Sequence, residues 1–150
     1  MDDREFSRLY FEYARTKLET RYGVLIKLFT KAWCKETASP SCQDGWSPSN
    51  PAFGQCAVTA LAIQTMCGGT LARTEVPGYG SHYFNRLVNG EGYSVYDLTK
   101  QQFPYAIRIP MPGEERDRAY VLHSPRAVEA RTLERYELLK ERLVAAMREG

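Results

Sequence analysis

Apolar positions recur at helical spacing, with polar positions between them, over the first third of the chain. The first apolar set follows an i, i+3, i+4 pattern and comprises Phe6, Leu9, Tyr10, Tyr13 and Ala14. A second set runs from Val24 to Trp33, and Gly23 is the predicted break between the two helices. The segment 37–53 is rich in Ser, Pro, Asn, Asp and Gly, which predicts a long loop, and long loops in small domains are often functional.

A compact apolar run follows this loop. The residues from Cys56 to Met66 are apolar on nearly all sides and end at Gly68-Gly69, which predicts a buried helix. Short β-like runs separated by Gly and Pro then predict an antiparallel sheet, at 70–76, 82–88, 93–98 and 105–109. Ser124 and Pro125 are typical of a helix start, and the apolar spacing beyond them predicts a C-terminal helix over 125–148. The expected fold class is α+β.

Composition and charge narrow the classes of protein. With 150 residues, 43% of them hydrophobic, the chain has the size of one domain with a sizeable core. The net charge is only +2 and basic residues are interleaved with acidic ones, so we expect no nucleic-acid partner. The first residues lack the pattern of a signal peptide, and no apolar run approaches the ~20 residues of a membrane span. We therefore expect a cytoplasmic protein without a membrane partner, and the sequence leaves its oligomeric state open.

The four cysteines are Cys34, Cys42, Cys56 and Cys67, and they show no CxxC spacing. In a reducing compartment they are expected to be free thiols. A zinc site that combines some of them with His82 or His123 is an alternative, but the spacing is not that of a zinc module. We expect no metal and no cofactor.

Cys56 lies at the start of the predicted buried helix. Unpaired backbone N–H groups and the positive end of the helix dipole favour a thiolate there, which would provide a nucleophile near neutral pH. Gly54 would let a substrate approach the backbone closely. The alternative is that Cys56 is a small buried apolar side chain with a packing role.

The hairpin downstream supplies a possible base. With Asn89 and Gly90 as the two turn residues, Val88 pairs with Glu91 and, counting outward, His82 lies opposite Asp97. Directly opposed residues have Cβ atoms about 5 Å apart, so the Asp97 carboxylate could hold an imidazole N–H of His82. A cysteine, a histidine and an orienting aspartate form the arrangement of a thiol acyl-transfer enzyme. Alternation places Arg86 on the face of His82 and places Tyr83 and Asn85 on the other face.

Several motifs together resemble the YunG-like family of uncharacterised bacterial proteins. The motifs are Trp33 and Thr37 in AWCKETAS, GQCAVTAL from Gly54, the Gly68-Gly69 pair, SHYFNRL from Ser81 and DLTKQQF from Asp97. They cover most of the segment 31–103. The resemblance implies one YunG-like domain over 1–150, with 1–22 as a helical N-terminal extension, and it implies no established activity.

The order of a helix-borne cysteine, then His and Asp on antiparallel strands, is similar to the papain-like and transglutaminase-like superfamily. That similarity implies a cysteine-bearing helix packed on the sheet, and thiol chemistry on an amide or acyl group. The expected activity is that of a thiol-dependent hydrolase or acyl/amide transferase, with a small-molecule or peptide amide, thioester or ester as substrate. In it Cys56 is the nucleophile, His82 the base and then the acid, and Asp97 the residue that orients His82.

Further residues are candidates for binding, each with a structural alternative. The Cys56 N–H with a side chain of Gln55 or Asn50 would stabilise an oxyanion. Arg86 could meet a substrate carboxylate or be a solvated surface residue. Pocket-wall candidates that could equally pack in the core are Trp33, Thr37 and Trp46.

Two other functions stay open. The chain could be a non-catalytic module that binds a small molecule or peptide, or an interaction subunit that uses its C-terminal helix. His123, just before that helix, competes with His82 as a base, although its position is typical of a helix entry.

Overall fold

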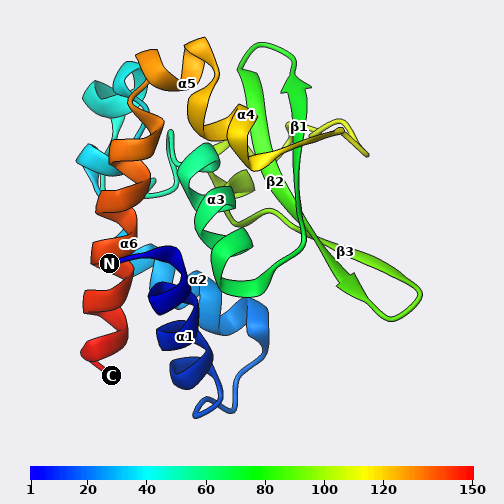
Figure 1. Cartoon of the computed structure of the whole chain (residues 1–150). Helices are drawn as coiled ribbons and strands as arrows, with labels where there is room; N and C mark the ends of the chain where they lie inside the picture. The colour runs from blue at the N-terminus through cyan, green and yellow to red at the C-terminus, as the bar shows by residue number, and fades with distance from the viewer.

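The computed structural model describes all 150 residues and places helices on one antiparallel sheet (Figure 1). The helices are α1 (Asp3–Ala14), α2 (Arg21–Ala32), α3 (Cys56–Cys67), α4 (Arg118–His123), α5 (Pro125–Glu129) and α6 (Thr132–Arg148). Short 3₁₀ helices are η1 (Lys35–Thr37), η2 (Pro40–Gly45) and η3 (Leu98–Gln102). The strands are β1 (Thr70–Val76), β2 (Gly80–Asn89), β3 (Gly92–Tyr96) and β4 (Glu114–Arg116), in the order β3-β2-β1-β4. The expected α+β class is confirmed.

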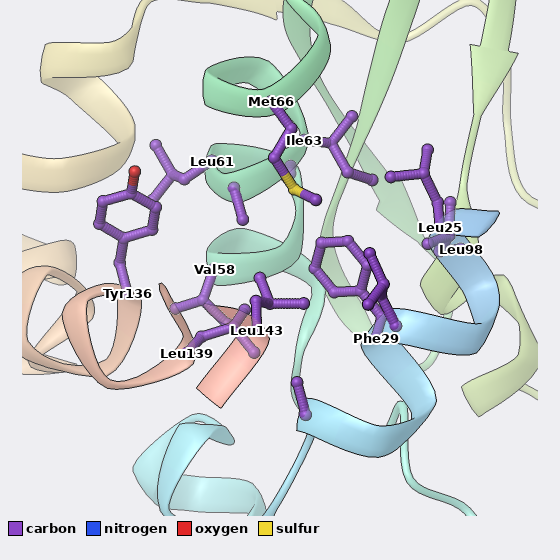
Figure 2. Close-up of a cluster of buried hydrophobic side chains, with 14 of the residues drawn as sticks. Leu25, Phe29, Val58, Leu61, Ile63, Met66, Leu98, Tyr136, Leu139 and Leu143 are labelled. Atoms are coloured by element: carbon purple, nitrogen blue, oxygen red, sulfur yellow. The ribbon is translucent and has the colours of Figure 1, made fainter. Parts of the chain in front are cut away.

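Helix α3 lies at the centre of the core because its apolar side chains cover nearly every side of the helix. Figure 1 shows it between α6 and the sheet, and Figure 2 shows its side chains meeting those of α2 and α6. Val58, Leu61 and Ile63 are fully buried. Burying an aliphatic side chain of this size stabilises a fold by about 1.5–3 kcal/mol. This packing gives Cys56, the first residue of α3, a fixed position.

Three predicted boundaries are wrong. The first two helices are separated by residues 15–20 and not at Gly23, because the Thr20 side chain caps α2 by accepting the Gly23 N–H at 3.1 Å. Residues 105–109 form no strand, and the fourth strand is Glu114–Arg116. Prolines at 104, 110 and 112 flank this segment, and each lacks the N–H group that would extend a strand ladder beyond it. The predicted helix over 125–148 is divided by Arg131, which has a left-handed φ of 56°.

The predicted hairpin register is wrong by two residues. Asn89 pairs with Gly92, so Gly90 and Glu91 are the turn residues, and Val88 pairs with Tyr93. Gly90 has a φ of 70° while Glu91 has no positive φ, which is the pattern of a type II′ turn with glycine first. A shift of two residues keeps every side chain on its predicted face of the sheet.

The pairing leaves one edge of β2 open. Strand β3 pairs with β2 only from Asn85 onward, so the first half of β2 has β1 on one side and no strand on the other. His82 belongs to this first half, where it pairs with Thr74 of β1. The open edge of β2 therefore leaves room for a side chain of α3 to approach His82.

Candidate active site

Cys56 stands at the N-terminus of α3 on a tightly packed turn. Gly54 has a φ of 75°, and a Cβ atom there would lie 2.6 Å from Cys42 Cβ, so only glycine fits. Gln55 occupies the N-cap position without a capping hydrogen bond from its side chain. The backbone N–H groups of Cys56 and Ala57 donate no hydrogen bond within the protein. Two donors at the positive end of the helix dipole therefore lie next to the thiol.

His82 and Asp97 form a buried pair. The His82 Nε2–H donates to both Asp97 carboxylate oxygens at 2.8 Å, and His82 is fully buried. Asp97 directly follows β3, at the N-cap position of η3, and reaches His82 diagonally across the hairpin. The contact was predicted from a register that is wrong, and it forms because the two-residue shift preserves the face. With Nε2 bound to Asp97, the proton acceptor of the neutral ring is Nδ1, which has no hydrogen-bond partner.

The thiol and the imidazole are coupled electrostatically. Burial opposes ionisation of the Cys56 thiol, but the neighbouring His82 imidazole and the Tyr83 backbone N–H together hold the pKa of Cys56 below its ordinary value. Burial likewise opposes the imidazolium, but the hydrogen bond to Asp97 and the interaction with Cys56 raise the pKa of His82 to about 9. Both shifts favour a thiolate–imidazolium pair, the form in which a cysteine is nucleophilic.

A cavity of about 370 Å³ opens beside Cys56. Its wall includes Cys56 and Ala57 from α3, Tyr83 from β2, Phe103 after η3 and Arg135 from α6. His82 lies outside the wall, with its ring 5.0 Å from that of Phe103 in an edge-on contact. Of Cys56, His82 and Asp97, only Cys56 thus belongs to the cavity wall.

The three pocket-wall candidates lie outside the cavity wall. Trp33 is buried in the core and its indole N–H donates to Thr59 Oγ1 at 2.9 Å. The Thr37 hydroxyl bonds the Cys34 carbonyl at 2.9 Å, and the Trp46 indole N–H bonds the Pro51 carbonyl at 2.9 Å. All three side chains hold the loop 33–53 in place.

The oxyanion and carboxylate candidates also lie outside the wall. Gln55 is buried, its Nε2 donates to the Cys34 carbonyl at 2.9 Å, and its Oε1 has no partner. The Asn50 amide donates to the Gln102 carbonyl at 3.4 Å. Arg86 donates to the carbonyls of Pro112 and Gly113, which attaches the segment before β4 to the sheet. The exposed His123 ends α4 and does not line the cavity.

Sequence reasoning missed the charged residues of the cavity. Arg73, Arg126 and Arg135 all line it, and Tyr83 does so although alternation turns it away from His82. No local pattern marks an arginine that faces a cavity. Tyr83 could have been considered on the ground that a neighbouring helix can contact the edge of a strand as well as one of its faces.

No group of three or more His, Cys, Asp or Glu side chains is placed to hold a metal ion. The structure also contains no helix with the length and apolar character needed to cross a membrane. The four cysteines are free thiols.

Fold and site together define an α+β protein in which a helix-borne cysteine meets a buried His–Asp pair. The sequence profile described as "YunG protein" matches residues 22–148, and the chain belongs to this YunG family. It is similar to the protein named "Uncharacterized protein YunG" of Bacillus subtilis (strain 168), with 33% identity over 94 residues. That similarity covers 63% of this chain and 73% of the relative. No solved structure matches the chain.

Proposed function

We propose that this protein is a thiol-dependent hydrolase or acyl/amide transferase in which Cys56 is the nucleophile. The supporting observation is the buried His82, whose Nε2–H donates to Asp97 at 2.8 Å while its Nδ1 has no hydrogen-bond partner. A ring held in this way is the acceptor that a thiol needs in order to ionise. Papain-like and transglutaminase-like enzymes share the chain order of a cysteine, a histidine and then an asparagine or aspartate, and we extend the proposal to a fold of that kind.

The first half-reaction forms a thioester. Cys56 Sγ forms a bond to the carbonyl carbon of an amide, thioester or ester, and the carbonyl electron pair moves to oxygen. When this tetrahedral intermediate collapses, the bond to the leaving group breaks and the imidazolium of His82 gives its proton to the leaving atom. Asp97 keeps the ring oriented and stabilises its positive charge.

The second half-reaction releases the enzyme. His82 takes a proton from water or from another acceptor, which attacks the thioester carbonyl, and Cys56 leaves as thiolate. Water gives hydrolysis, whereas an amine or alcohol gives transfer. The free N–H groups of Cys56 and Ala57 are the proposed oxyanion donors, because both residues line the cavity at the start of α3. In this proposal Gln55 supports the loop through Cys34.

Alkylation with iodoacetamide across pH, read by mass spectrometry at each cysteine, tests the proposal. Cys56 should react roughly ten- to a hundredfold faster than the other three cysteines at pH 6, where an ordinary thiol is almost entirely protonated. His82→Ala should abolish this advantage. His123→Ala is the matched control, because the chain has only these two histidines, and it should leave the advantage intact.

A Cys56 thiol of ordinary reactivity would contradict the proposal that this protein is an enzyme. If Cys56 reacts no faster than Cys34 at pH 6, or reacts equally fast in His82→Ala, the thiol is not activated. The non-catalytic binding module would then be the better description of the cavity.

A further inference from the structure

The cavity beside Cys56 is lined by charges of one sign. Its charged residues are Arg73, Arg126 and Arg135, and no aspartate or glutamate contributes to the wall. The remaining polar lining consists of hydroxyl, thiol and amide groups. A cleft with one sign of charge concentrates ligands of the opposite sign.

Arg135 is the most informative of the three arginines. Its side chain is buried, with 6% of the residue exposed, and it has no carboxylate within ion-pairing distance. Its N–H groups donate to the carbonyls of Ala130 at 2.9 Å and Thr37 at 3.0 Å, and more weakly to the Thr132 hydroxyl at 3.4 Å. A buried charge is normally compensated by an opposite charge, and neutral carbonyls supply hydrogen bonds without that compensation.

The neighbouring charges do not balance the arginines. The Cys56 thiolate, the His82 imidazolium and the Asp97 carboxylate together carry one net negative charge, which offsets one of the three arginines. Arg73 is paired with Glu75 at 2.6 Å, and this offsets a second. The Arg126 side chain is exposed and forms no ion pair or hydrogen bond within the protein. One guanidinium at the cavity therefore lacks a counter-charge.

We propose that the substrate carries a single carboxylate group, bound by Arg135 and Arg126 while Cys56 attacks a carbonyl elsewhere in the same molecule. This inference rests on the proposed function, since it assumes that Cys56 is the reacting atom. The planar guanidinium matches a carboxylate in shape and charge. One uncompensated positive charge fits a monoanionic carboxylate better than a phosphate dianion. A cavity of about 370 Å³ lies at the small end of ligand sites, which favours a small molecule.

Two alkylating agents of the same size test this proposal. Iodoacetate and iodoacetamide react with a thiolate in the same way, and only iodoacetate carries a carboxylate. The measured quantity is the ratio of their rate constants at Cys56, divided by the same ratio at Cys34, which does not line the cavity. The thiolate fraction cancels in each ratio. We expect a normalised ratio of roughly ten or more, because the arginines concentrate the anion.

Variants assign the effect to the arginines. Arg126→Gln removes an exposed side chain without internal partners, so it should fold normally and lower the normalised ratio severalfold. Arg135→Met should lower it further, and Arg126→Gln alone carries the test if Arg135→Met does not fold. Arg148→Gln is the matched control, because it makes the same change of net charge at the far end of α6, and it should leave the ratio unchanged.

The outcomes distinguish the two proposals. A normalised ratio near one, or a fall in Arg148→Gln equal to that in Arg126→Gln, overturns the carboxylate assignment. Inorganic phosphate that protects Cys56 from iodoacetamide more strongly than acetate at equal ionic strength also overturns it, in favour of a phosphate. The activation of Cys56 is measured separately with the neutral iodoacetamide across pH, so its failure would appear there and not in the ratio.

Discussion

At the scale of single residues, the two nitrogens of His82 have different roles. Nε2 is tied to Asp97, and Nδ1 is left to interact with Cys56. A buried imidazolium is costly unless a carboxylate compensates it, and Asp97 is that carboxylate. Asp97 therefore affects the thiol indirectly. It makes the imidazole of His82 more basic, and a more basic imidazole stabilises the Cys56 thiolate better.

Asp97→Asn tests this chain of effects. The amide keeps the shape of the carboxylate and removes its charge, so the pKa of His82 should fall from about 9 toward the ordinary value of 6.5. The measurement is an NMR titration of imidazole protons, in which the exposed His123 gives the only other signal. Glu75→Gln is a control that removes a carboxylate with no hydrogen bond to His82. An unchanged titration midpoint in Asp97→Asn would show that Asp97 does not set the basicity of His82.

At the scale of elements, helix α3 could be predicted from the sequence, whereas the pairing of the strands could be predicted only in part. An apolar run ended by Gly68 predicts a buried helix from local residues alone, and α3 begins at Cys56 as expected. The turn was ambiguous because Asn89, Gly90 and Glu91 satisfy either of two turn registers, and only contacts along both strands decide between them. Strand β4 has only three residues and depends on pairing with β1, so its own sequence carries no strand signal.

Glycines at both ends of α3 allow a matched test of how tightly Cys56 is held. Gly54 and Gly68 have similar φ values of 75° and 79°. A Cβ atom added at Gly54 would clash with Cys42, whereas a Cβ atom added at Gly68 would have no other atom within 4 Å. Gly68 also has a ψ of −154°, which places it in a backbone region essentially restricted to glycine, so Gly68→Ala should show only the backbone strain of about 1–3 kcal/mol. Gly54→Ala should lose about 1–3 kcal/mol more in the free energy of unfolding, because the turn must shift. Urea denaturation measures both variants.

The same pair of variants reports on the site. Gly54→Ala should slow alkylation of Cys56 at pH 6, because the displaced turn carries the thiol away from His82, and Gly68→Ala should not. Equal losses of stability in the two variants would contradict the close packing of Gly54 against Cys42.

At the scale of the whole molecule, the cavity is closed by segments far apart in the chain. Arg73 comes from the sheet, Phe53 and Gly54 come from the long loop, and Arg126 and Arg135 come from α5 and α6. The contact between His82 and Asp97 could be predicted because one hairpin holds both residues. The arginines could not, because their approach to Cys56 depends on how α5 and α6 pack, which no local pattern encodes.

Helix α1 ties the two ends of the chain together although it precedes the family match, which starts at residue 22. Phe6 is fully buried in the core. Asp3 accepts hydrogen bonds from the Tyr136 hydroxyl at 2.6 Å and from Lys140 Nζ at 3.0 Å, both on α6, and from Arg118 on α4 at 3.1 Å. Only 3% of the Lys140 side chain is exposed, so this ammonium depends on Asp3 and Glu137 for compensation.

Asp3→Ala should destabilise the fold in a pH-dependent way. Burial opposes ionisation of Asp3, but the hydrogen bonds from Tyr136 and Lys140 and the nearby positive charges hold the pKa of Asp3 below 3.8. A carboxyl group with a depressed pKa in the folded state contributes stability above its unfolded pKa, and this contribution is lost as pH falls through the folded value. At pH 7 we expect a loss of about 1–3 kcal/mol in the free energy of unfolding, since Lys140 and Tyr136 each lose a partner.

Denaturant titrations of the native protein and of Asp3→Ala from pH 7 down to pH 3 provide the measurement. The difference between the two proteins should be constant near neutral pH and should narrow below about pH 4 as Asp3 takes up a proton. Glu5→Ala, on the exposed face of the same helix, removes a carboxylate that pairs only with Arg8, and it should cost less than about 1 kcal/mol at every pH. A loss for Asp3→Ala that matches Glu5→Ala at pH 7 would mean that α1 is held by Phe6 and its apolar neighbours alone, with no contribution from the charge network to α4 and α6.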